Sequence, residues 1–143
     1  MSSKELDNLV DLGLLKREPG DQLEFNGLVA SGRKRLADAN NAELAAESKF
    51  DLAYNAAHAL ALAAMRWHGF RPAGKRHIVF QTLGYTLKIK PEIWRVLDKC
   101  HGRRNSFEYA GEFNVDAQLL EDLMGAAERL AVAVNKLGPV STL

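Results

Sequence analysis

The chain has 143 residues, of which 47% are hydrophobic, and its formal net charge at pH 7 is +1. This length and composition predict one domain with a substantial hydrophobic core rather than two independent domains. The nearly balanced charge excludes a protein that binds nucleic acid through its overall positive field, so any contact with RNA must come from a local basic patch.

Three features of the sequence predict a cytoplasmic protein with no membrane segment. The single cysteine, Cys100, cannot form an intramolecular disulfide and fits a reducing compartment. The N-terminal residues 1–10 lack the long apolar core of a signal peptide. The most apolar run, Leu52–Met65, contains Asn55 and His58 and is too short to span a bilayer, so we expect a buried helix there.

Two helices are predicted in the first 40 residues. The apolar residues of the first recur at helical spacing: Leu6, Leu9, Val10 and Leu14. The second is predicted from Phe25 to Ala39, with Asn26 as its N-cap. We expect residues 1–24 to form an N-terminal helical extension and residues 25–143 to form the main bundle.

A long central helix is predicted over residues 43–68, ended by Gly69. Asn40 and Glu43, three residues apart, resemble a capping box at its start. Because the helix is apolar nearly all round between Leu52 and Met65, we expect it to lie in the middle of a bundle.

The connection after this helix, residues 70–77, is predicted to be a loop because it contains Gly and Pro. It carries four basic-type residues: Arg71, Lys75, Arg76 and His77. Either these side chains bind phosphate groups together with the helix that carries Arg104, or they belong to an ordinary solvent-exposed loop.

The C-terminal half of the chain predicts three further helices. A short helix is expected over residues 78–87, and Pro91 is suited to the first turn of the next. A strongly amphipathic final helix, opened by Asn114 or Asp116, runs to Leu137. No segment alternates with period two, so we predict an all-α, up-and-down bundle of four main helices with short flanking helices.

The helix within Trp94–Gly111 has an inward face that changes from apolar to charged. Four of its residues and the preceding Ile93 fall close to one line, and the residues on this line are Ile93, Leu97, Cys100, Arg104 and Phe107. His101 and Glu108 flank this line, so Arg104 occupies a position where a core residue is expected. A buried guanidinium requires a partner, a polar cleft or an interface.

The histidines offer few other sites. Tyr54 and His58 form a helical i, i+4 pair. Either their polar atoms are hydrogen-bonded inside the core, or the two residues belong to a site. The four histidines lack the spacing of common zinc motifs, and the chain has neither a Gly-rich phosphate loop nor a G-x-S-x-G motif. We therefore predict no metal and no cofactor.

The segment from Arg104 to Tyr109, R-N-x-x-x-Y, resembles the signature of the HEPN superfamily, the higher eukaryotes and prokaryotes nucleotide-binding domains. The resemblance covers roughly Phe25 to Leu137. It implies a small helical bundle that is usually a homodimer. In ribonuclease members, two such motifs meet across the dimer and cut RNA without a metal. Many members belong to toxin–antitoxin or defence systems beside a nucleotidyltransferase-like partner.

Carried over residue by residue, Arg104 matches the signature arginine and Asn105 the polar residue after it. Tyr109 stands where the family has a histidine, and a phenol exchanges protons poorly at neutral pH. The resemblance thus implies Arg104 and Tyr109 as catalytic residues, with phosphate or RNA binding by Arg103, Asn105 and the nearby basic side chains. Those side chains are His101, Arg71, Lys75, Arg76 and His77.

Three functions are compatible with these residues. The first is a weakly catalytic or non-catalytic protein that binds RNA or nucleotide phosphate. The second is a metal-independent endoribonuclease toxin, with Tyr109 or His101 transferring protons. The third is an interaction module without a ligand, whose exposed apolar faces serve a nucleotidyltransferase-like or other partner. In a purely structural alternative, Arg104 pairs with Glu108 and Asn105 with Tyr109 at i, i+4, and these pairs merely stabilise a dimer seam.

Overall fold

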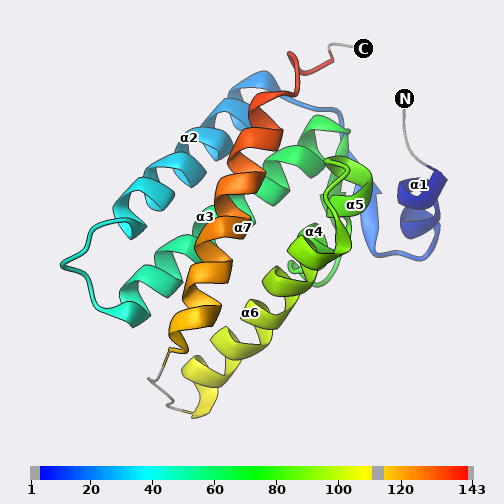
Figure 1. Ribbon diagram of the computed structural model, residues 1–143. Helices are drawn as coiled ribbons and strands as arrows, with labels where there is room; N and C mark the ends of the chain where they lie inside the picture. Colours follow the sequence, from blue (N-terminus) through cyan, green and yellow to red (C-terminus); the bar gives the residue numbers. More distant parts are fainter. Residues whose placement is uncertain (1–3, 111–114, 142–143) are drawn as a thin grey trace.

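The structure, a computed structural model, describes residues 4–110 and 115–141, and for residues 105–110 it describes the backbone alone. The described residues form seven helices, four of them long, and one two-stranded sheet. The four long helices lie alongside one another in a bundle (Figure 1). The all-α bundle predicted from the sequence is therefore confirmed. None of the described helices combines the length and the apolar character needed to cross a lipid bilayer.

The N-terminal segment is attached to the bundle through a small antiparallel sheet. After α1 (Lys4–Asp11), strand β1 (Leu15–Arg17) pairs with β2 (Phe70–Pro72), so that Lys16 lies opposite Arg71. Residues 70–72 therefore form a strand where the sequence predicted a loop. Gly69 turns the chain just before β2 with a φ of +86°, a conformation that glycine adopts without steric cost.

Helix α2 (Gln22–Ala39) begins three residues earlier than predicted. Its N-cap is Asp21, whose carboxylate accepts a hydrogen bond from the Leu23 backbone N–H at 3.3 Å. The prediction of Asn26 as N-cap was wrong, because Asp is an equally good cap and lies directly after the Pro19-Gly20 break. Asn26 instead lies inside the helix, where its amide oxygen accepts a hydrogen bond from Gln22 at 2.8 Å.

Helix α3 (Ala46–Trp67) is the central element, and it packs against α2 and α7. The predicted capping box was wrong: Asn40 is the C-cap of α2, and the Asn41 side chain accepts from the Glu43 backbone N–H within the turn that follows. The alanines of α3 let α2 approach closely. A Cβ added to Gly32 of α2 would lie only 2.7 Å from Cγ of Leu60.

The remaining helices follow the predicted order with one difference. The expected helix over residues 78–87 is split into two single turns, α4 (Ile78–Gln81) and α5 (Leu83–Thr86). Helix α6 (Pro91–Ala110) starts at Pro91 as predicted. Helix α7 (Ala117–Asn135) is capped by Asp116, the second of the two candidates.

A buried arginine that the sequence did not single out holds the sheet to the bundle. Arg66, at the end of α3, is only 2% exposed. Its Nε donates to Glu24 at 2.7 Å, and its terminal nitrogens donate to the carbonyls of Glu18 and Pro19 at 2.9 and 2.8 Å. Arg71 completes the network by donating to both Glu18 and Glu24.

Candidate functional site

Five polar or charged side chains from three elements meet beside α6, and we call them the Tyr54 cluster. They are Tyr54 and His58 from α3, His77 at the start of α4, and His101 and Arg104 from α6. Packing of α3 against α4 and α6 brings these helices together. Figure 1 shows α3, α4 and α6 side by side in this part of the bundle.

Tyr54 is the centre of the cluster. Its side chain is buried, and its hydroxyl shares a hydrogen bond of 2.9 Å with Nδ1 of His101. The ring of His77 stacks on that of His101, with ring centroids 4.3 Å apart. A loop residue and a helix residue therefore place two half-buried imidazoles in contact.

Arg104 continues the buried face of α6 beyond Leu97 and Cys100, as the helical spacing predicted. Its guanidinium carbon lies 5.1 Å from the centroid of the Tyr54 ring, within the range of a cation–π contact. Its Nε donates to Asp51 at 3.3 Å, and the Arg104 side chain is 30% exposed. The guanidinium is thus fixed against α3 while part of it remains open to solvent.

Burial and nearby positive charge lower the pKa values of two cluster histidines, His58 and His101. Burial, reinforced by the charge of Arg76, lowers the pKa of His58 from 6.5 to about 4. Burial also lowers the pKa of His101, with smaller contributions in the same direction from His77 and Arg104. An anion bound between these groups would oppose this effect, because it stabilises the protonated imidazole.

The other residues predicted for the site are distributed differently. Arg103 follows His101 on α6 and is half-buried, whereas Lys75 and Arg76 are exposed on the loop before α4. Asn105 and Tyr109 lie on the backbone of α6, and their side chains are outside the described residues, as is that of Glu108.

Arg71 lies apart from the cluster. It belongs to the network of Arg66, Glu18 and Glu24 beyond the C-terminal end of α3. Tyr54 of the cluster and Trp67 at the end of α3 are about 20 Å apart along the helix axis, so the Arg71 network lies well away from the cluster. The paired carboxylates hold the Arg71 charge in place, so we leave this residue out of the proposed site.

The composition of the cluster limits its chemistry. No group of His, Cys, Asp or Glu side chains within the described residues is arranged to hold a metal ion. Burial raises the pKa of the Cys100 thiol to about 12, so this thiol stays protonated and is a poor nucleophile. The remaining chemistry is anion binding by Arg104 and proton exchange by imidazoles.

One residue of the site was missed by sequence reasoning. Asp51 lies three residues before Tyr54 on α3, so the two side chains share a helix face. That spacing could have identified Asp51 as a partner for any cation brought to Tyr54. No sequence pattern could have predicted the contact between His77 and His101, because it joins a loop to a helix that is distant in the sequence.

No protein family model, curated protein sequence or solved structure matches this chain. The resemblance to HEPN domains therefore remains one of sequence, at the residues of the motif.

Proposed function

We propose that this protein binds RNA or nucleotides through a phosphate group at the Tyr54 cluster, as a weakly catalytic or non-catalytic HEPN-type protein. The observation that carries the proposal is the arrangement of Arg104, His101 and His77 around one buried tyrosine. A guanidinium binds phosphate oxygens in a bidentate manner, and imidazole and aromatic rings stack on nucleobases.

The ion pair of Arg104 with Asp51 is compatible with this role. The side chain of Asp51 is 60% exposed. Ion pairs that are exposed to solvent contribute little to stability. A phosphate can therefore replace the carboxylate at small cost. A cytoplasmic homodimer of the HEPN type belongs to the same proposal, and sedimentation at rising protein concentration tests it.

The direct test is the binding of a short, 5′-labelled single-stranded RNA, followed by fluorescence anisotropy at several salt concentrations. We expect Arg104→Ala to weaken binding about tenfold or more, because a charge-assisted contact is lost. The slope of log affinity against log salt should fall by about 0.7 for each phosphate contact removed.

Arg95→Ala is the matched control for this test. Arg95 lies on the same helix and is exposed, and it stacks over its neighbour Trp94 rather than contacting the cluster. The proposal fails if wild-type protein does not bind at low salt, or if the two variants weaken binding equally.

A second candidate, metal-independent RNA cleavage, is favoured by the contact between His77 and His101. Two imidazoles near a guanidinium provide a general base, a general acid and charge stabilisation for attack by the ribose 2′-hydroxyl. Cleavage in the presence of a chelator that disappears in His101→Ala would support this activity. Intact RNA after long incubation at high protein concentration would contradict it.

A further inference from the structure

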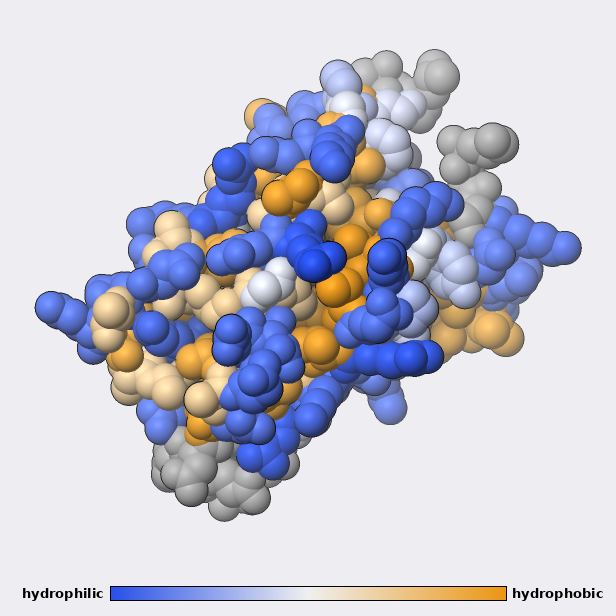
Figure 2. All heavy atoms as spheres, in the orientation of Figure 1, coloured by the Kyte–Doolittle hydropathy of each residue, from blue (hydrophilic) through white to orange (hydrophobic). Residues whose placement is uncertain are grey.

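A groove of about 1030 Å³ lies between α7 and the connection that joins α5 to α6. No residue of the Tyr54 cluster lines it. In Figure 2, hydrophobic surface between α7 and the α5 region is flanked by hydrophilic atoms on both sides. Its α7 wall extends from Gly125 to Ala133, about 12 Å along the helix, and Lys136 and Leu137 continue the wall just after α7.

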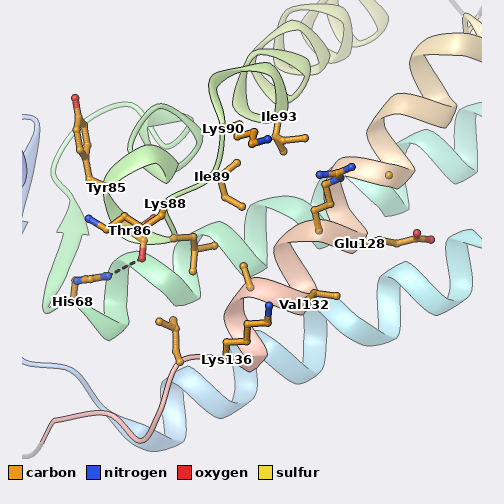
Figure 3. Close-up of a pocket in the computed structure, with 15 residues that line it drawn as sticks. His68, Tyr85, Thr86, Lys88, Ile89, Lys90, Ile93, Glu128, Val132 and Lys136 are labelled. Atoms are coloured by element: carbon orange, nitrogen blue, oxygen red, sulfur yellow. Dashed lines mark hydrogen bonds between the residues drawn. The ribbon is translucent and has the colours of Figure 1, made fainter.

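The walls of the groove are mainly apolar. Ile89 and Ile93 lie on one side, and Val132 of α7 lies on the other (Figure 3). Val132 is 57% exposed, and together with the half-buried Ile89 and Ile93 it forms one apolar surface. The groove therefore leaves apolar surface in contact with water.

The rim of the groove is strongly basic. Four exposed cations line it: Lys88, Lys90, Arg129 and Lys136. Glu128 is the single carboxylate among its lining residues. No ion pair joins any of the four cations to a carboxylate within the described residues. A chain of net charge +1 thus concentrates four cations against one anion here.

Two local features point to a ligand in the groove. Thr86, which lines it, is only 4% exposed, and its hydroxyl has no hydrogen-bond partner among the described residues. Burial of an unpaired hydroxyl is unfavourable, and a polar ligand group can relieve it. Lys88 adopts a φ of +58°, a strained conformation for a residue with a Cβ.

We propose that this groove binds an amphipathic organic anion, a small molecule with an apolar body and one acidic group. The apolar walls accept the body, and the basic rim accepts the acidic group. The volume is that of a small-molecule site, and Thr86, with its unpaired buried hydroxyl, belongs to the wall. This site is independent of the function proposed for the Tyr54 cluster.

The probe for this proposal is 1-anilinonaphthalene-8-sulfonate, which combines an aromatic body with one sulfonate and fluoresces in apolar surroundings. N-phenyl-1-naphthylamine is its neutral analogue. We expect Val132→Glu to weaken binding of both probes at least tenfold. We expect Lys88→Gly, which relieves the backbone strain, to weaken the sulfonate at least threefold and to leave the neutral analogue within twofold.

Leu23→Glu is the control for general surface binding. Leu23 is 80% exposed on α2 and does not line the groove, so its substitution should leave both affinities within twofold. Equal effects of Val132→Glu and Leu23→Glu would overturn the proposal. So would a wild-type dimer that Val132→Glu splits, because the groove would then be an interface between two copies.

The imidazole of His68 reports on the same groove. Its Nε2 donates to the Thr86 carbonyl at 2.8 Å (Figure 3). The sulfonate probe should shift the NMR signals of His68 and leave those of His77 and His101 in place. A shift of the cluster histidines alone would assign the probe to the Tyr54 cluster and overturn the groove proposal, whatever the result for RNA.

Discussion

Arg104 contacts Tyr54 and Asp51 of α3, and these two contacts act in opposite directions on the binding of an external anion. The Tyr54 ring supports the guanidinium from one side, while the Asp51 carboxylate competes with any phosphate for its N–H groups. Because of this electrostatic competition, the Asp51 carboxylate lowers the affinity of Arg104 for an external anion.

Replacing Asp51 with Asn should therefore strengthen the binding of single-stranded RNA, by about threefold to tenfold at low salt, because it removes a nearby negative charge. Asp38→Asn is the control, since Asp38 pairs with Lys34 on the exposed face of α2. Anisotropy titrations of the two variants measure the difference. Equal affinities would show that Asp51 does not face the bound phosphate.

His58 should make the free energy of unfolding depend on pH in the mildly acidic range. Its folded-state pKa of about 4 lies below the ordinary 6.5, so the unfolded chain takes up a proton in this window that the folded chain does not. The free energy of unfolding should therefore fall as the pH falls from 6.5 toward 4, by at most about 3 kcal/mol.

Denaturant unfolding at a series of pH values, compared between wild type and His58→Gln, measures this effect. The variant should lose much of the slope above pH 4.5, while the lowered pKa values of His68 and His101 leave a residual slope of the same sign. The pKa values of Glu18 and Glu24 are also lowered, but their contribution is lost only at lower pH. An unchanged slope in the variant would contradict the assignment.

At the level of elements, the attachment of the β1–β2 sheet depends on one helix-terminal side chain. Arg66 donates hydrogen bonds to three backbone carbonyls and to Glu24, and its partners come from the segment before α2, the first turn of α2 and β2. Buried charges of this kind stabilise the fold only while every partner is present.

Arg66→Met should lower the free energy of unfolding by about 3–5 kcal/mol, because it leaves three backbone carbonyls without their donor and Glu24 with Arg71 as its remaining partner. Arg17→Met is the comparison, since the pair of Arg17 with Asp7 is exposed and should cost less than about 1 kcal/mol. Urea denaturation measures both. A similar small loss in the two variants would show that the Arg66 network contributes little.

The long helices could be predicted from the sequence, whereas the sheet could not. Apolar spacing identified α3, α6 and α7, and the position of Pro91 identified the start of α6. The strands are three residues long, too short for alternation to be visible, and they form because glycine turns bring distant segments together.

The candidate site likewise combines features that the sequence predicted with features that it did not. The inward position of Arg104 followed from its spacing on α6, and Tyr54 was singled out through its spacing from His58. The contact of His77 with His101 and the groove beside α7 depend on how whole elements pack, so no local pattern revealed them.

At the scale of the whole molecule, the two proposed sites lie at different places along the central helix. Tyr54 belongs to the cluster, whereas His68, which lines the groove, follows about 21 Å later along α3. All four histidines of the chain therefore report on one of the two places, and a single spectrum can distinguish them.

The most direct test of the central claim is an NMR titration of these four imidazoles with adenosine 5′-monophosphate. Phosphate binding at the Tyr54 cluster should shift the signals of His77 and His101 and raise the pKa of His101, because a bound anion stabilises its protonated form. The signals of His68 should not move. A shift of His68 alone, or no shift of any histidine at millimolar nucleotide, would contradict the account.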